Sequence, residues 1–347
     1  MTGEGSLFDV PPAAIGRFRV LHQVGAGTCG PVFRAVDPAT DTPAAIKLFT
    51  INLPPERLAG FLEALANLVT AMPPLSSAVK PLAAGLHDHT PYFATSFAEG
   101  DSLDVALKQF GPAALPDLVP RVRALAGVLD AAAGRGILHG ALHPRDVTVS
   151  ESETTLTGLG VWPILAVHGE RLPIRRPYRA PELGDSAITA AGDQFSLAAL
   201  AYEWMTSRRA PSAFVGGDMA PVPGADREAL AAIFARALHP DPDRRFSSCG
   251  EFVTALGEVA ALMADEAGVS ATEARPRKRG RTPVVPTLPL ESTAANEPEV
   301  EPVAGSAGEP LTYFPPQADE TAPGVDRQAR TRPVSYTHLT LPTNSRV

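Results

Sequence analysis

The sequence is poor in cysteine: among 347 residues only Cys29 and Cys249 carry a thiol. Two distant cysteines cannot form a disulfide framework, and such scarcity is typical of a protein from a reducing compartment. Long apolar runs are absent too, and residues 1–9 lack the basic start and apolar stretch of a signal peptide. Positive charge is not in excess, since the net charge is -8. We therefore expect a cytoplasmic protein that does not bind nucleic acid.

The ends of the chain differ in composition from its middle. Residues 1–15 contain Gly and Pro and are expected to be a flexible leader, whereas residues 264–333 are rich in Pro, Ala, Glu and Thr and cannot bury a core. We predict disorder there, with a basic run at 275–281 that is a solvated charge cluster or, alternatively, a contact with an anionic surface. Residues 334–347 resemble a translated sequencing adapter. If so, the true C-terminus is missing, and the protein would be membrane-anchored only if a span followed the linker.

A glycine-rich turn lies near the start of the remaining chain. It has the spacing G-x-G-x-x-G-x-V and stands between two strand-like runs, F-R-V-L-H-Q-V and V-F-R-A-V. Glycines allow backbone amides to approach phosphate oxygens, and a strand after the turn favours a hairpin over a dinucleotide-binding unit. The residues predicted to surround a nucleotide here are Gly25, Ala26, Gly27, Gly30 and Val32.

Five further motifs follow in a fixed order. They are T-P-A-A-I-K-L-F at 42–49, I-L-H-G-A-L-H-P-R-D at 137–146, T-G-L-G at 157–160, A-P-E at 180–182 and G-D-Q-F-S-L at 192–197. Each is weak alone, but their order from Phe18 to Met263 resembles the bacterial Ser/Thr-type protein kinase domain. The resemblance implies an α+β, two-lobed fold over residues 16–263, with a small β-rich lobe at about 16–96 and a larger helical lobe at about 100–263.

The resemblance also implies a nucleotide site. Lys47 and Ala45 match the strand whose lysine holds the α- and β-phosphates, although a strand-end Lys in solvent is the simpler reading in isolation. Glu63 is the candidate partner of Lys47, with an ordinary surface Glu as the alternative. The segment P-Y-F-A-T-S-F-A-E-G resembles the hinge between the lobes. By this match Thr95, Phe97 and Ala98 would surround the adenine.

The catalytic positions of the family are not retained. Ala141 stands where the catalytic Asp belongs, and Gly158 replaces the Asp that holds Mg²⁺. Asp146 matches a second metal ligand and is a weak metal candidate, so Mg²⁺ binding is doubtful while ATP is the expected cofactor. His139 is expected to be structural.

Architectural positions, in contrast, match the family. Glu182 of A-P-E is expected to pair with Arg244 or Arg245 of P-D-P-D-R-R-F, and we assign the partner as Arg245. Asp193 is expected to bond the amides of the 137–146 loop. The activation segment, Val161 to Arg179, contains no Ser or Thr and therefore cannot be switched by Ser/Thr phosphorylation.

Three functional hypotheses remain. The first is a nucleotide-binding pseudokinase that signals by binding protein partners. The second is a weakly active Ser/Thr kinase that uses Asp146 and an unorthodox base, and the third is an interaction domain without nucleotide. Arg175 and Arg176 belong to a solvated basic loop or, alternatively, to a docking patch for an acidic or phosphorylated partner.

Overall fold

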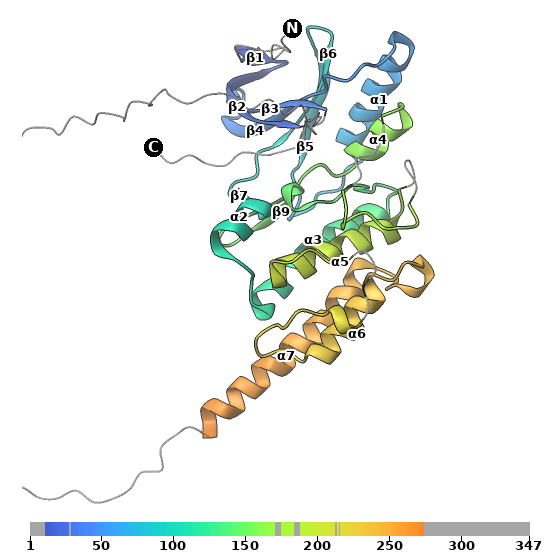
Figure 1. Ribbon diagram of the computed structural model, residues 1–347. Helices are drawn as coiled ribbons and strands as arrows, with labels where there is room; N and C mark the ends of the chain where they lie inside the picture. The colour runs from blue at the N-terminus through green and yellow to red at the C-terminus, as the bar shows by residue number, and fades with distance from the viewer. Residues whose placement is uncertain are drawn as a thin grey trace, which may run out of the picture. The chain divides into compact units, whose positions relative to one another are not determined.

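The computed structural model describes residues 11–27, 29–170, 175–183, 188–211, 214 and 216–273. A six-stranded antiparallel sheet with the order β1-β2-β3-β4-β6-β5 forms its first part (Figure 1). Its strands are β1 (Ala14–Ile15), β2 (Phe18–Gly27), β3 (Gly30–Asp37), β4 (Thr42–Leu48), β5 (Pro81–His87) and β6 (Thr90–Ser96). One face buries apolar residues at alternate positions of the strands, as a half-buried sheet requires; these include Phe18, Phe33, Ile46 and Tyr92.

The first strand corrects the predicted leader. Residues 1–15 were expected to be flexible, yet Ala14 and Ile15 pair with β2. The Ile15 side chain is fully buried beside Phe18 because it completes the apolar face of the sheet. Residues 1–10 lie outside the described part of the chain.

One helix, α1 (Pro55–Ala71), belongs to the sheet part of the molecule. Pro55 stands in its first turn, where its missing N–H costs nothing. The helix ends just before Pro73 and Pro74, which cannot continue it. Its buried face consists of Phe61, Leu65 and Leu68.

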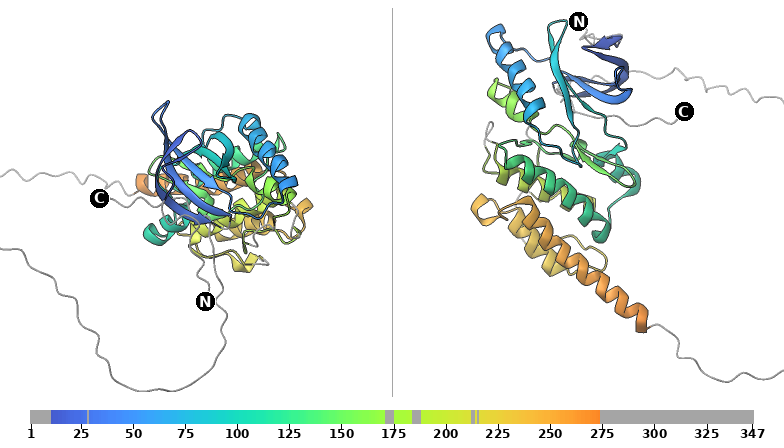
Figure 2. Two further views of the ribbon diagram at one scale, coloured as in Figure 1. Left: turned by 90° about the horizontal axis from the view of Figure 1, so that it is seen from above. Right: turned by 180° about the vertical axis from the view of Figure 1, so that it is seen from behind.

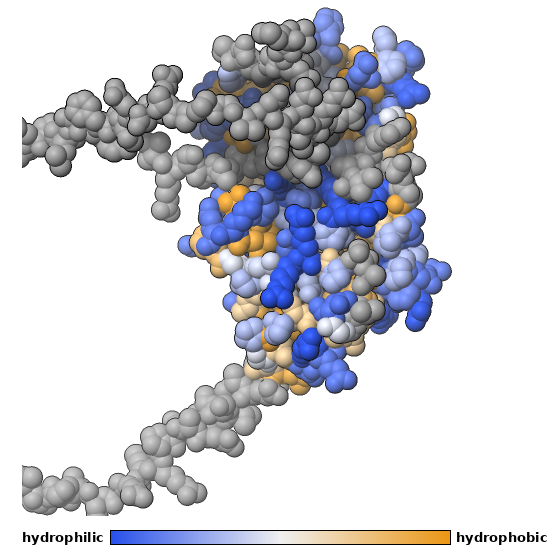
Figure 3. Space-filling model, in the orientation of Figure 1, coloured by the Kyte–Doolittle hydropathy of each residue, from blue (hydrophilic) through white to orange (hydrophobic). Residues whose placement is uncertain are grey.

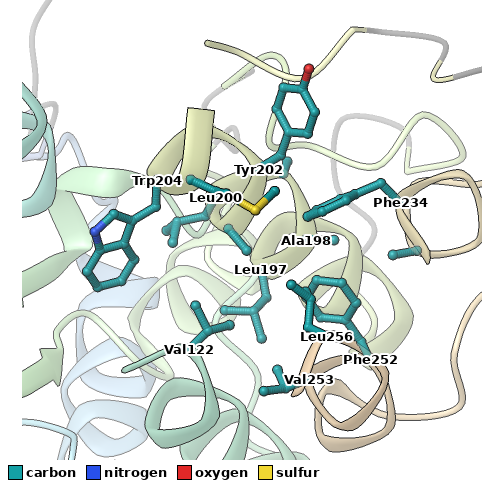
Figure 4. Close-up of a cluster of buried hydrophobic side chains, with 14 of the residues drawn as sticks. Val122, Leu197, Ala198, Leu200, Tyr202, Trp204, Phe234, Phe252, Val253 and Leu256 are labelled. Carbon is teal, nitrogen blue, oxygen red and sulfur yellow. The ribbon is translucent and has the colours of Figure 1, made fainter. Parts of the chain in front are cut away.

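The second part is mainly helical. It contains α2 (Leu103–Phe110), α3 (Leu115–Ala133), α4 (Val161–Val167), α5 (Ala190–Thr206), α6 (Arg227–Ala237) and α7 (Cys249–Glu273), with short 3-10 turns at Pro144–Asp146, Gly216–Asp218 and Pro242–Arg244. A small sheet of β7 (Asp101–Ser102), β8 (Val147–Val149) and β9 (Thr154–Leu156) carries the loops that face the first part. The core of this part surrounds α5, which is buried on nearly all sides by α3, α6 and α7 (Figure 4).

The last helix corrects a second boundary. We expected it to end at Met263, but α7 continues to Glu273, so the predicted disordered linker cannot begin at residue 264. At its start, the Asp130 carboxylate accepts hydrogen bonds from the amides of Cys249 (2.9 Å) and Gly250 (2.8 Å). Asp130 thus provides acceptors for two amides of the first turn that have no partner within the helix. The basic run 275–281 and residues 334–347 lie outside the described residues.

No helix in the described part of the chain has the length and apolar character that crossing a membrane requires. On the face shown in Figure 3, hydrophilic side chains predominate and the hydrophobic ones form only separate patches. Two of the large apolar side chains that are most exposed, Phe110 and Val167, lie at the ends of different helices. Isolated exposure of this kind is ordinary for a protein surface.

Candidate functional site

A cavity of about 90 Å³ lies between the six-stranded sheet and the loops of the helical part. Six residues predicted as site positions line it: Val32, Ala45, Lys47, Thr95, Asp146 and Gly158. Sequence analysis missed the others that narrow it, notably Cys29, Trp162 and Leu165. The wall of the cavity is mainly apolar, with Lys47, Arg145 and Asp146 as its charged members.

The glycine-rich turn is a tight hairpin that folds onto the end of β4. Gly27 and Gly30 face each other across β2 and β3, and Cys29 is buried in the cavity wall. Gly30 has a φ of 121°, and a Cβ there would lie 2.4 Å from the carbonyl oxygen of Leu48. Only glycine fits this close approach. Gly25, Ala26, Gly27 and Gly30 do not line the cavity in this conformation, and their contact with phosphates stays a prediction.

Lys47 is held by the same hairpin. Its ammonium group donates a short hydrogen bond to the carbonyl oxygen of Gly30. Burial lowers the pKa of Lys47 to about 8, and the nearby Cys29 acts in the opposite direction. Burial likewise raises the pKa of the Cys29 thiol. The Cys29 side chain is therefore an uncharged part of the wall at neutral pH.

The predicted pairing of Lys47 with Glu63 is wrong in this structure. Glu63 lies exposed on α1, and no described carboxylate forms an ion pair with Lys47. The reason lies on the inner face of α1. Phe61, Leu65 and Leu68 pack there in an apolar cluster, which leaves Glu63 on the solvent side.

Helix α4 fills the place beside that apolar face. Residues 161–179 were expected to form an activation loop, but V-W-P-I-L-A-V folds as α4 and lies beside α1 in both Figure 1 and Figure 2. Trp162 and Leu165 bury their side chains in the same cluster as Leu65 and Leu68. The unbroken apolar run was the signal for this helix, because a solvated loop does not carry such a run.

The loop around His139 is firmly supported. Asp193 accepts hydrogen bonds from the amides of His139 (2.7 Å) and Gly140 (2.8 Å), as we predicted from the sequence. Burial raises the pKa of Asp193, and the nearby His139 and the two amides oppose that rise. The His139 ring is fully buried, with Nε2 3.0 Å from the carbonyl oxygen of Thr157. His139 therefore connects two loops.

The supported loop carries no base at its centre. Ala141 is 8% exposed and offers only a methyl group. Gly158 has a φ of 78°, and a Cβ there would contact the His139 ring at 3.6 Å. Neither position provides an oxygen or nitrogen side-chain atom for proton transfer or metal binding.

Asp146, the remaining candidate metal ligand, is already paired. Arg175 donates from Nη1 to Asp146 Oδ2 at 2.7 Å and to the Ala141 carbonyl oxygen at 2.9 Å. The side chains of Arg175 and Asp146 are only 14% and 8% exposed, and the guanidinium also lies 5.8 Å from the ring of Trp162. Arg175 is therefore not part of a free docking patch, which corrects one sequence hypothesis. Arg176, its neighbour, is exposed.

A second ion pair fixes the end of the activation segment. Arg245, rather than Arg244, bonds both carboxylate oxygens of Glu182, at 2.7 Å and 2.5 Å. The same guanidinium donates to the carbonyl oxygens of Ala191 and His239. This bidentate pair is of the strong kind and confirms the predicted contact.

The hinge residues lie less favourably than predicted. Thr95 lines the cavity, whereas Phe97 and Ala98 do not. The amide of Phe97 donates to the carbonyl oxygen of Pro43 at 3.2 Å, and its ring lies 4.4 Å from the guanidinium carbon of Arg34. Because this amide already has an acceptor, it is not available to an adenine edge in this conformation.

Comparison with known proteins gives one consistent result, although no protein-family model matches the chain. The serine/threonine-protein kinase PknH of Mycobacterium tuberculosis is 25% identical over 314 residues, which cover 82% of this chain and 49% of that protein. PknE of Mycobacterium bovis is 26% identical over 335 residues, covering 87% and 56%. The chain thus spans about half the length of these relatives.

Solved structures agree with the sequence relatives. The kinase domain of PknI from M. tuberculosis superimposes with a TM-score of 0.53 at 26% identity, covering 71% of this chain and 96% of that domain. The chain has the features that the kinase motifs predicted: two lobes, the glycine-rich hairpin, the supported His139 loop and the Glu182–Arg245 pair. The chain accordingly has the protein kinase fold and is similar to the kinase domains of bacterial Ser/Thr protein kinases.

Proposed function

We propose that this domain is a pseudokinase, which does not transfer phosphate and acts in signalling by binding other molecules. The observation that carries the proposal is the buried ion pair between Arg175 and Asp146. It engages the carboxylate that could still hold a metal, beside an Ala at the base position and a Gly at the other metal position. The scaffold of the site is retained while its reactive groups are missing or paired.

The residues present do not fit a magnesium ion. Mg²⁺ takes oxygen ligands and in phosphate sites is held by carboxylates together with the phosphates. Asp146 is the one described carboxylate that lines the cavity, and Arg175 bonds it. No group of three or more His, Cys, Asp or Glu side chains suited to a metal occurs in the described ranges. Absence of a general base alone lowers a rate by roughly 10² to 10⁴.

ATP, without Mg²⁺, is the nucleotide that we propose as ligand. Val32, Ala45 and Thr95 would hold its base in the apolar part of the cavity, and Lys47 its phosphates. The cavity of about 90 Å³ is small beside the roughly 300 Å³ or more of typical ligand sites. Binding therefore requires the glycine hairpin to lift and the hydrogen bond from Lys47 to Gly30 to break.

The same two observations favour a second candidate, an interaction domain that binds no nucleotide. In that case the apolar wall and the bond between Lys47 and Gly30 are the permanent state of the site. The two candidates share the binding role and differ only in the need for a nucleotide.

Thermal melting of the full chain with ATP separates them. At a concentration ten times the Kd, ATP would add about 1.4 kcal/mol, which raises the Tm by roughly 3 °C in a domain of this size. We expect that shift with and without Mg²⁺, and we expect Lys47→Ala to abolish it. If millimolar ATP does not shift the Tm, the second candidate, an interaction domain without nucleotide, is the one that is supported. Transfer of labelled γ-phosphate to a general substrate would refute the pseudokinase itself.

A further inference from the structure

A groove of about 430 Å³ with several charged side chains runs beside the His139 loop, outside the cavity described above. It lies among α2, the turn at Pro144–Asp146 and the end of α5. Arg145 belongs to the lining of both the groove and the cavity. The charged and titratable side chains that line the groove are Asp104, Lys108, His143, Arg145, Glu203 and Arg209, with Tyr178 beside them.

Both carboxylates of the groove already have partners. Asp104 accepts from the Ser102 hydroxyl at 2.7 Å and pairs with Arg145 Nε at 3.1 Å. Burial alone would raise the pKa of Asp104, but these partners outweigh it and the pKa lies below its ordinary value. Glu203 accepts a short hydrogen bond from the Tyr178 hydroxyl. The Tyr178 hydroxyl is neutral, so Glu203 keeps its negative charge, but the groove still has more cations (Lys108, Arg145 and Arg209) than acids (Asp104 and Glu203).

Two of the cations, Lys108 and Arg209, have donors to spare. Arg145 uses Nε for Asp104, and its Nη1, which has no hydrogen-bond partner among the described residues, is buried. Lys108 is 72% exposed and approaches Asp104 only at 3.5 Å. Arg209 is exposed and forms no ion pair within the described ranges. Burial lowers the pKa of His143 to about 4, so this ring is neutral and adds no charge at pH 7.

We infer that this groove binds an acidic segment of a partner protein, whose side-chain carboxylates accept hydrogen bonds from Arg209 and Lys108 and are attracted by the charge of Arg145. Guanidinium groups match carboxylates in shape and donor geometry. The three cations come from separate elements along the groove, which suits successive side chains of a peptide better than one small ion. The inference names a partner class for the binding role proposed above. It is independent of whether ATP binds.

Fluorescence anisotropy with the full chain tests the inference. The probe is a labelled peptide of alternating Glu and Ala, and its counterpart with Lys in place of Glu is the specificity control. We expect the acidic peptide alone to bind, more weakly at about 0.3 M than at about 0.05 M salt because exposed charges are screened. Arg209→Glu and Lys108→Glu are each expected to weaken binding about tenfold, since they place a like charge opposite the ligand.

Arg208→Glu is the matched control, because Arg208 is exposed next to Arg209 but does not line the groove. We expect it to change the affinity less than about twofold. Equal losses in the Arg208 and Arg209 variants, equal binding of the two peptides, or no binding of the acidic peptide would each overturn the inference. If inorganic phosphate displaces the peptide and acetate does not, the groove prefers phosphate groups, and the inference of a carboxylate ligand is overturned. The ATP melting series measures a different ligand, so a failure of peptide binding and a failure of ATP binding can be told apart.

Discussion

Replacing Arg175 by alanine is the most direct test of how the site is closed. The substitution removes a charge-assisted hydrogen bond of 2.7 Å to Asp146 and a second bond of 2.9 Å to the carbonyl oxygen of Ala141. The first is worth about 1.5–3 kcal/mol and the second about 0.5–1.5 kcal/mol. Asp146, only 8% exposed, is left without its counter-ion, and breaking a buried pair in this way costs about 3–5 kcal/mol. Because Arg175 keeps 14% exposure, we expect about 3 kcal/mol.

Urea unfolding of four proteins measures this quantity: the parent chain, Arg175→Ala, Asp146→Asn and the double variant. If the two side chains interact, the double variant is more stable than the sum of the single losses predicts, by about 1–2 kcal/mol. Arg176→Ala is the control, since Arg176 lies in the same segment but is exposed. Its effect should stay within about 0.5 kcal/mol. A loss below about 1 kcal/mol for Arg175→Ala, with additive single variants, would refute the closed ion pair.

Three further substitutions follow from the contacts and pKa values above. The folded-state pKa of His143 is about 4 against an ordinary 6.5, so the unfolded chain binds more protons between these values. The free energy of unfolding should therefore fall as the pH decreases from 6.5 to 4, by at most about 3 kcal/mol, and His143→Gln should flatten the part of that slope that His143 causes. The folded-state pKa of Lys47 is about 8 rather than 10.5, which means that the buried ammonium opposes folding by up to about 3 kcal/mol below pH 8. Lys47→Met removes this cost and also the hydrogen bond to Gly30, so the net effect on the ligand-free domain should be a stabilisation of about 1–3 kcal/mol. Urea unfolding at pH 7 measures it, and a net destabilisation would contradict the burial of a charged amine. Glu182→Ala leaves the buried Arg245 without its carboxylate and should cost about 2–4 kcal/mol in the same assay, whereas an unchanged midpoint would mean that the pair is not formed in solution.

The parts of the fold that follow local rules were predictable from the sequence. Alternation and glycine spacing located the β2–β3 hairpin, and the motif order indicated that Asp193 and Glu182 support the loops. Both positions were predictable because their contacts are well defined: Asp193 accepts from two neighbouring backbone amides, and Glu182 from one bidentate arginine. Their roles do not depend on how the two lobes are packed against each other.

The contacts inside the site were less predictable because tertiary packing decides them. Glu63 has the right charge and approximate position for Lys47, but the apolar residues of α1 face α4 and turn Glu63 outward. Arg175 was one of several arginines in a basic segment, and nothing in the sequence distinguishes the one that reaches Asp146. The boundary at Ile15 failed for a similar reason, since a two-residue strand has no periodicity to detect.

The apolar cluster around α4 has a consequence for how the domain unfolds. It combines Phe49 and Phe93 of the sheet part with the inner face of α1, Trp162 and Leu165 of α4, and Ala141 of the His139 loop. Besides the core cluster of each lobe, this third cluster thus crosses from one lobe to the other and couples their unfolding. Unfolding should be one cooperative transition by every spectroscopic probe. Any molecule that pulls α4 outward would loosen the glycine hairpin and the His139 loop together, which makes this helix the mechanical connection between the lobes.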